Sequence, residues 1–244
     1  MSQCESDGAR PLEGSRYFAR VAQRVVHWLT TQTHAGRLYE VDIRLRPDGG
    51  KGLLVTSLQA FADYQRERAW IWEQQALVRA RPIAGDAETM RAFSTLRAQL
   101  LTRERNADEV RSQVTSMRAR WRSERDRSSA ALLDLKQGAG TLLDIEFILQ
   151  TQVLLQARAH PQLLADGNSA ALIAAAERST LLSSAQAQAL AQAHAALLKG
   201  SLTCTLDARS RLVARSAELA AYSAGVLRVA RALGLDFEAL TPAS

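Results

Sequence analysis

One stretch decides the fold class of this 244-residue chain: Leu38-Tyr39-Glu40-Val41-Asp42-Ile43-Arg44-Leu45-Arg46. From Val41 onward apolar and charged residues alternate, which is typical of a β-strand with one apolar and one charged face. The turn-forming run Pro47-Asp48-Gly49-Gly50 follows, and Leu53-Leu54-Val55 has the composition of a returning strand. The stretch therefore predicts a β-hairpin over residues 38–55.

Helical patterns lie on both sides of this hairpin. Upstream, apolar residues recur at helical spacing from Phe18 to Leu29, with Ser15 as the expected N-cap. Downstream, Ser57 opens a second helix that includes Phe61 and Trp72. Residues 76–83 then alternate arginine with apolar residues, and this pattern fits either the last turns of that helix or a third strand.

The chain after about residue 86 is helical in pattern throughout. Breaks at residues 137–140, at Pro161 and at Gly234 divide it into expected helices at about 87–101, 108–130, 142–159, 169–177, 184–206 and 207–234. We therefore predict an α+β fold that is mostly α. A small sheet-containing domain over residues 1–86 precedes a helix bundle over residues 87–244.

Composition narrows the classes of function. The chain has 31 basic and 25 acidic residues, a net charge of +6, which permits a nucleic acid, a nucleotide or an acidic protein as a partner. Nucleic acid is the weakest of these, because acidic residues are interleaved through the arginine-rich segment 103–127. Two cysteines 200 positions apart indicate neither a disulfide framework nor a metal site, and no apolar run is long enough for a membrane span or a signal core. We expect a cytoplasmic protein without a membrane partner.

The charged strand face is the candidate for chemistry. On a strand, Glu40 and Asp42 would point to the same side about 7 Å apart, with Arg44 and Arg46 continuing the row. Carboxylate oxygens suit a hard cation, and guanidinium groups suit polyphosphate, so a Mg-nucleotide site is one interpretation. A solvated edge strand is the alternative. Arg79 and Arg81 offer a second pair with the same spacing.

Three parts of the sequence resemble the glutamine synthetase adenylyltransferase family. The most extensive is the run from Gly36 to Asp86, which contains LYEVDIRLRPDGGKGLLVTSLQAFADYQRERAWIWEQQALVRARPIAGD. The others are DLKQGAGTLLDIEFILQ at Asp134–Gln150 and DGARPLEGSRYFARVAQRVVHWL at Asp7–Leu29. The resemblance covers residues 7–160, and it implies a partial nucleotidyltransferase-type sheet followed by a C-terminal helix bundle.

The resemblance also implies a function in the regulation of nitrogen metabolism. Family members have one half that attaches AMP from ATP to a tyrosine of glutamine synthetase and a related half that removes it by phosphorolysis. The segment Trp70–Leu77 and the run Asp144-Ile145-Glu146-Phe147 are similar to the attaching half. Glutamine synthetase is thus the expected partner, together with a nitrogen-regulatory signalling protein, and ATP and Mg²⁺ are the expected substrate and cofactor.

The resemblance assigns roles to the residues named above. Asp42 would be the catalytic residue and a metal ligand, with Glu40 as a second metal ligand. Five basic residues would bind the ATP phosphates or support the site: Arg44, Arg46, Arg79, Arg81 and Lys136. One departure is clear, because the family's metal site also needs an Asp-x-Asp pair on an earlier strand, and no such pair precedes Asp42.

We therefore expect a piece of a longer multifunctional enzyme that is inactive by itself. Three alternatives remain open. They are the adenylyl-removing half, a non-catalytic helical module that binds glutamine synthetase or a regulatory protein, and a basic nucleic-acid binder.

Overall fold

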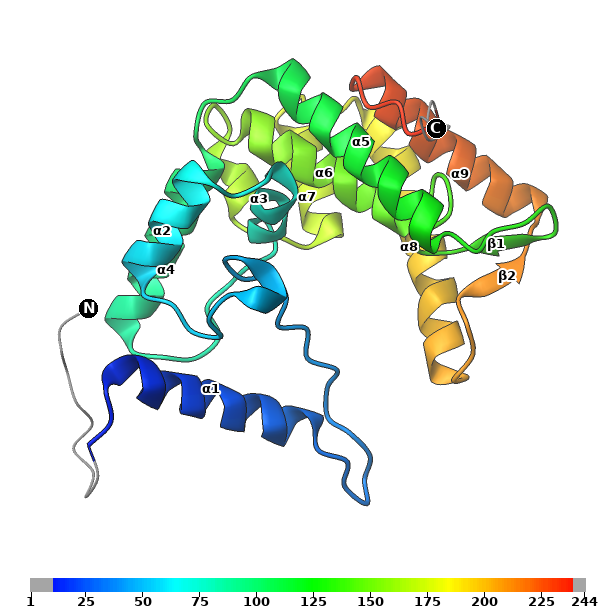
Figure 1. Ribbon diagram of the computed structural model, residues 1–244. Helices are drawn as coiled ribbons and strands as arrows, with labels where there is room; N and C mark the ends of the chain where they lie inside the picture. Colours follow the sequence, from blue (N-terminus) through cyan, green and yellow to red (C-terminus); the bar gives the residue numbers. More distant parts are fainter. Residues whose placement is uncertain (1–10, 239–244) are drawn as a thin grey trace. The chain divides into compact units, whose positions relative to one another are not determined.

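Residues 11–238 are described by the computed structural model, in which the chain divides into two compact units, Met1–Glu73 and Gln74–Ser244 (Figure 1). The described residues are mostly helical and contain one two-stranded sheet, which confirms the α+β, mostly α class. The expected domain boundary at residue 86 falls inside the second unit and stays a prediction. Cys4 lies outside the described residues.

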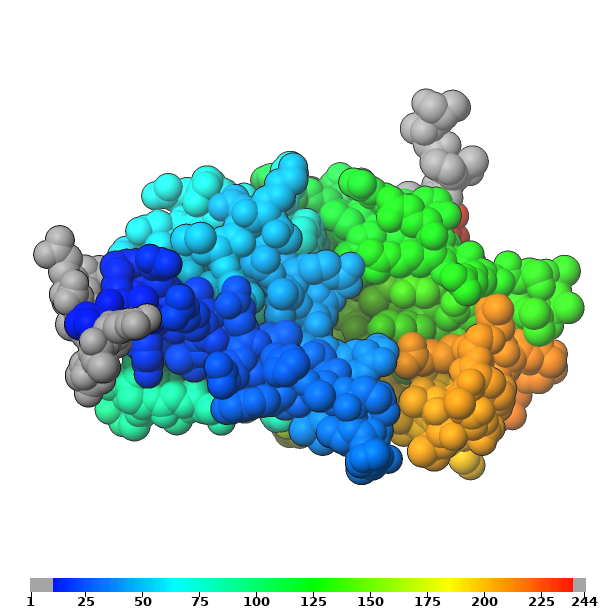
Figure 2. All heavy atoms as spheres, turned by 60° about the horizontal axis from the view of Figure 1, so that its bottom comes forward, coloured from blue at the N-terminus to red at the C-terminus, as the bar shows by residue number. Residues whose placement is uncertain are grey.

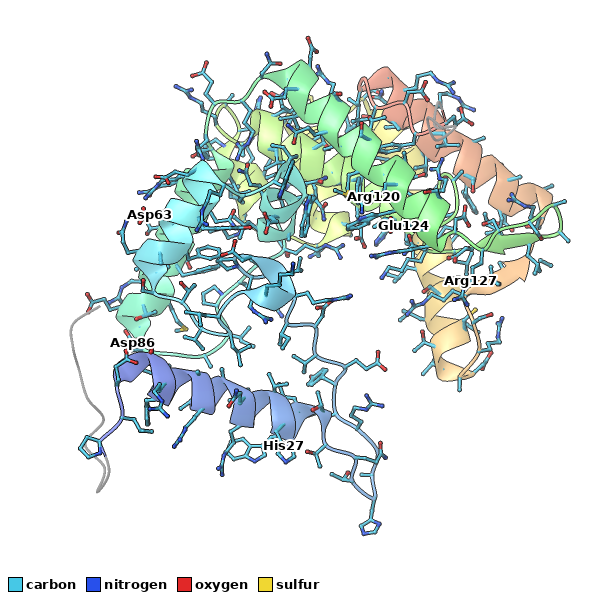
Figure 3. All side chains as sticks on the ribbon, in the orientation of Figure 1. His27, Asp63, Asp86, Arg120, Glu124 and Arg127 are labelled. Carbon is cyan, nitrogen blue, oxygen red and sulfur yellow. The ribbon has the colours of Figure 1, made fainter. Side chains whose placement is uncertain are left out.

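The first unit begins with helix α1, Gly14–Thr30. Its N-cap is Glu13, whose carboxylate accepts a hydrogen bond from the Ser15 amide at 3.1 Å, so the expected N-cap Ser15 lies inside the helix instead. His27 is in the last turn (Figure 3). No residue of α1 is buried, and five of its large apolar side chains are exposed, namely Tyr17, Phe18, Val21, Val25 and Trp28.

The predicted hairpin is wrong, because residues 37–57 contain no strand. The segment is irregular apart from a short 3₁₀ helix at Gly49–Lys51. Asp42 accepts the amide of Arg44 at 2.9 Å, and this local turn competes with extended pairing. Arg46 donates to the carbonyl oxygens of Gly50 at 3.3 Å and Gly52 at 3.4 Å, so a side chain occupies acceptors that a ladder would use.

Two short helices follow, where the sequence predicted one. Helix α2 spans Leu58–Glu67 and begins at the predicted N-cap Ser57, whose Oγ accepts the Ala60 amide at 3.1 Å. Helix α3 starts afresh at Ile71–Leu77. Turn hydrogen bonds continue from the end of α3 to Ala80, and residues 80–83 form neither helix nor strand, so the third strand is absent and only the first part of this stretch continues the helix.

The second unit is a helix bundle built around one central helix (Figure 1). Its helices are α4 Ala87–Leu101, α5 Ala107–Arg125, α6 Leu142–Gln156, α7 Ser169–Arg178, α8 Ser184–Leu206 and α9 Ala217–Ala232, with a 3₁₀ turn at Pro161–Leu164. Helix α6 packs against α5, α7, α8 and α9, and 11 of its 15 residues are buried. A helix that is apolar on all sides is expected at the centre of a bundle.

The only sheet among the described residues lies in this unit. Strands β1, Leu132–Asp134, and β2, Leu212–Ala214, pair antiparallel with Leu133 opposite Val213. In Figure 2 the orange surface of the segment that contains β2 lies beside the green surface of the segment that contains β1. Because residues 212–214 form a strand, α9 begins at Ala217 instead of at the predicted residue 207. Three residues are too few to show a period of two, which explains why the sequence did not reveal these strands.

Among residues 11–238, no helix is both long enough and apolar enough to cross a membrane.

Candidate functional site

Asp42 and Arg44 form a two-pronged ion pair on the surface of the first unit. Nη2 of Arg44 lies 2.7 Å from Oδ2 of Asp42, and Nε lies 2.9 Å from Oδ1. The side chains are 51% and 75% exposed, respectively. The side-chain and backbone hydrogen bonds from Arg44 lower the pKa of Asp42 from 3.8 to about 2. The carboxylate is therefore charged at every physiological pH and open to solvent on one side.

The other two members of the predicted charged row differ from this pair. Glu40 is exposed. Arg46 closes the turn at residues 43–52 through hydrogen bonds to backbone carbonyl oxygens, including that of Ile43. The four charges thus do not form the straight row that a strand would give, and Arg46 has a structural task in its own loop.

Arg79 and Arg81 lie in the second unit, on the wall of a cleft of about 570 Å³. Arg97 of α4 and the loop residues Asp166 and Asn168 line the same cleft. Arg97 donates to the carbonyl oxygens of Leu77, Val78 and Leu164 at 2.6–3.2 Å, and burial lowers the pKa of its guanidinium. The predicted arginine pair is thus joined by a third arginine that the sequence analysis did not single out.

Lys136 is exposed in the loop that follows β1 and does not line this cleft. Its backbone amide donates to Oδ1 of Asp134 at 2.9 Å, as does the amide of Gln137. This arrangement makes Asp134 the residue that shapes the start of the glycine-containing loop at residues 137–141.

A buried ionic network holds the other end of that loop. Asp144, in the first turn of α6, forms ion pairs with Arg118 and, at 3.2 Å, with Arg122, while its Oδ2 accepts the Gly140 amide at 2.6 Å. Arg118 and Asp144 have fully buried side chains. Burial raises the pKa of the Asp144 carboxyl, and the two guanidinium groups and the Gly140 amide counteract that rise.

Helix α5 therefore presents two different charged faces. Arg118 and Arg122, four residues apart, point inward to Asp144, whereas Arg120 and Glu124 form an exposed pair at 3.0 Å on the outside (Figure 3). The i, i+4 spacing of the inward arginines is visible in the sequence. It was missed because the same segment is dense in charge on every side.

Glu146 takes part in a second cluster, between α6, α7 and α8. Its Oε1 lies 3.2 Å from Nη1 of Arg79, and Nη2 of Arg79 donates to Oγ of Ser169 at 2.9 Å. Burial lowers the pKa of His194, the nearby positive charge of Arg79 lowers it further, and Glu146 opposes the shift. The residues Asp144 and Glu146, two positions apart, thus face two separate sites.

The described residues fit a magnesium site only in part. Asp42 offers oxygen of the right chemistry, but both of its oxygens are engaged by Arg44. Within residues 11–238, no three His, Cys, Asp or Glu side chains gather as metal ligands would. We therefore derive no reaction step through the metal.

Comparison with known proteins gives the class of the chain. The family model described as GlnD PII-uridylyltransferase matches residues 108–239, more than half of the chain, and the one described as glutamate-ammonia ligase adenylyltransferase matches residues 1–96. Both descriptions name enzymes that transfer nucleotidyl groups, so the chain is of the nucleotidyltransferase class.

Curated relatives narrow this class. Three of them are bifunctional glutamine synthetase adenylyltransferase/adenylyl-removing enzymes. The relative from Stenotrophomonas maltophilia strain K279a is 52% identical over 95% of this chain, that from Xanthomonas axonopodis pv. citri 51% over 95%, and that from Pseudomonas syringae pv. tomato 44% over 80%. The chain belongs to the glutamine synthetase adenylyltransferase family. It spans about a quarter of the length of these relatives, namely 25%, 25% and 21%.

Proposed function

We propose that this chain forms part of the adenylylating half of an enzyme that transfers AMP from ATP to a tyrosine of glutamine synthetase. One observation carries the proposal: the identity of 52% to a bifunctional relative extends over 232 residues. Both compact units are therefore included in the match, together with Asp42 in the first and the Asp144 network in the second.

The state of Asp42 limits the role that it can have. A carboxyl group with a pKa of about 2 accepts a proton poorly from a tyrosine hydroxyl, whose ordinary pKa is near 10. Asp42 therefore acts as a fixed negative oxygen donor and not as a general base. Arg44 keeps it ionised and orients it, and the solvent-facing side of the Arg44 guanidinium stays available to a phosphate.

In this proposal the second unit contributes to the reaction indirectly, by fixing the positions of a loop, a helix and an arginine side chain. The Asp144 network fixes the glycine-containing loop and the start of α6, and Glu146 fixes Arg79. We assign Arg46 and Lys136 to the shape of their loops, and Glu40 to the solvent-exposed surroundings of Asp42. In the complete enzyme ATP is the substrate, Mg²⁺ supplies charge neutralisation on the phosphates, and the site of action is the cytoplasm.

A chimera tests this proposal. The aligned segment of the Stenotrophomonas maltophilia relative is replaced by residues 1–244 of this chain, and the chimera is given labelled ATP and unmodified glutamine synthetase. We expect Mg-dependent transfer of label to glutamine synthetase. Removal of AMP from modified glutamine synthetase, measured in parallel with added phosphate, should persist at the level of the parent enzyme.

The opposite pattern identifies the alternatives. A chimera that attaches AMP normally but no longer removes it would place this chain in the adenylyl-removing half. The parent enzyme performs both reactions. A folded chimera that still binds glutamine synthetase but performs neither reaction would indicate that this chain is a binding module.

We expect no transfer by the 244-residue chain alone, because the family resemblance requires two further aspartates beside Asp42. The measurement is label transfer to glutamine synthetase from ATP. Mg-dependent labelling above background would show that Glu40 or another carboxylate of this chain replaces the missing pair.

A further inference from the structure

The cleft of the second unit is lined by three arginines, of which Arg79 has an ion-pair partner, Glu146, outside the cleft lining. Arg79, Arg81 and Arg97 line it, and Asp166 is the one carboxylate among its lining residues. Asp166 is engaged by Asn168, which donates its amide to Oδ1 at 2.9 Å and its side-chain nitrogen to Oδ2 at 2.7 Å. Within the described part of the chain, no carboxylate forms an ion pair with Arg81 or Arg97.

Arg97 is held as a rigid, half-buried donor. Nε, Nη1 and Nη2 of Arg97 each donate one hydrogen bond to a backbone carbonyl oxygen, which uses three of its five N–H groups. These bonds fix the orientation of the guanidinium group. One N–H on Nη1 and one on Nη2 remain. Since no carboxylate of residues 11–238 pairs with the guanidinium, an anion in the cleft would relieve the cost of its burial.

The backbone around the cleft is closely packed, which gives the cleft a fixed wall. A Cβ at Gly167 would overlap the carbonyl oxygen of Val78 and approach Cα of Arg79, so this loop can lie against residues 78–79 only with glycine here. Arg79 is tied to Glu146 and Ser169 behind the wall. Arg81 is exposed and stands beside the two fixed arginines.

We propose that this cleft binds the phosphate group of a small molecule, with Arg97 and Arg81 as the two ligands and Arg79 as the neighbouring charge. The proposal develops the phosphate-binding role that the family resemblance implies for Arg79 and Arg81, adds Arg97 to it, and does not require that the chain transfers AMP. A guanidinium fork matches phosphate oxygens in a bidentate manner, and a concave site of this volume suits a small molecule better than a flat protein surface. An acidic peptide is the competing occupant.

Calorimetric titration of the 244-residue chain with pyrophosphate tests the proposal, with inorganic phosphate as the smaller probe. Binding is expected for both at low salt, tighter for pyrophosphate, and weakened as salt rises. Arg81→Gln removes an exposed ligand whose side chain forms no hydrogen bond or ion pair with residues 11–238, so we expect affinity to fall about fivefold. Arg81→Glu should abolish binding, while the circular dichroism spectrum stays unchanged.

Arg91→Glu is the matched control, because Arg91 is an exposed arginine of the same helix as Arg97 but does not line the cleft. It should leave the affinity unchanged. The proposal is overturned if pyrophosphate does not bind the chain at low salt. It is also overturned if Arg81→Glu and Arg91→Glu weaken binding equally, or if an acidic peptide binds where neither phosphate probe does.

Discussion

Two aspartates of this chain pair with arginine in opposite surroundings. Asp42 and Arg44 lie on the surface of the first unit, with side chains that are 51% and 75% exposed, beside a turn that contains Gly49 and Gly50. Asp144 and Arg118 are fully buried in the second unit, beside a loop that contains Gly138 and Gly140. Residue types and neighbouring glycines are alike, but Asp144 is buried and also binds Arg122 and the Gly140 amide, whereas Asp42 is exposed and is bound by its near neighbour Arg44.

This difference in burial distinguishes residues that stabilise the fold from residues that are accessible for chemistry. A buried ion pair that loses one partner leaves an uncompensated charge, whereas an exposed pair contributes little to stability because water screens it. Asp144 is therefore expected to be indispensable for folding of the second unit. Asp42 is expected to be dispensable for folding, and its side chain is exposed to solvent.

Replacing Asp144 should have the largest effect on stability. Asp144→Asn leaves Arg118 buried without its counter-ion, and we expect the free energy of unfolding to fall by about 3–5 kcal/mol. The matched variant Asp42→Asn should lower it by no more than about 1 kcal/mol. Urea denaturation followed by circular dichroism measures both, and equal losses for the two variants would contradict the comparison.

Substitutions in the two glycine-containing loops should have the second largest effect on stability. Gly140 has φ of +70°, and a Cβ there would overlap the carbonyl oxygen of Ser223, whereas Gly50 has no atom within 4 Å of that position. Gly140→Ala should therefore lower the free energy of unfolding by about 2 kcal/mol or more. Gly50→Ala should change it by no more than about 0.5 kcal/mol. A Gly140→Ala variant as stable as the parent would show that this loop can move away from α9.

The pKa of Asp42 offers a direct test of the exposed pair. In the parent chain, NMR titration of the Asp42 carboxyl should give a midpoint near a pKa of about 2, and Arg44→Gln should bring it back toward 3.8. The pKa is lowered by folding, so the contribution of the pair is present above about pH 4 and is lost as the pH falls toward 2. Arg37→Gln, a control at another exposed arginine, should leave the midpoint of Asp42 unchanged. A midpoint near 3.8 in the parent chain would show that Asp42 and Arg44 do not form this ion pair in solution.

The smallest expected effect is on His194, next to Arg79 and Glu146. Its pKa lies below the ordinary 6.5, so Arg79→Gln should raise the pKa and Glu146→Gln should lower it further. Because the neutral form is favoured in the folded state, the contribution of His194 to stability declines as the pH falls below 6.5. Imidazole NMR titrations measure these shifts, and a midpoint that responds to neither variant would remove His194 from this cluster.

The helices of the second unit were predictable because their apolar residues recur over many turns. Helix α4 was predicted with its observed end points, and the starts of α7 and α8 also agree. The hairpin at residues 38–55 was predicted wrongly, since alternation describes the side-chain pattern of a strand but does not supply a partner strand. Arg44 and Arg46 instead satisfy local acceptors, which a period of two does not reveal.

The candidate site was predictable to a different extent. The sequence singled out Asp42, Arg79 and Arg81 by type and spacing, but it could not show that Arg44 closes on Asp42 or that Arg97 joins the second arginine pair. Arg97 is at least 16 positions along the chain from both Arg79 and Arg81. Only the packing of α4 against residues 77–81 brings the three arginines together. Contacts between distant segments are set by packing and leave no local pattern.

The central claim is that Asp42 serves AMP transfer and not the fold. The most direct measurement compares AMP transfer to glutamine synthetase by the chimera described above with transfer by the same chimera carrying Asp42→Asn. The account predicts a loss of at least about a hundredfold in rate, since a fixed charge at a reacting centre is worth that much. The free energy of unfolding should fall by no more than about 1 kcal/mol. An Asp42→Asn chimera that transfers AMP as fast as its parent would contradict the account.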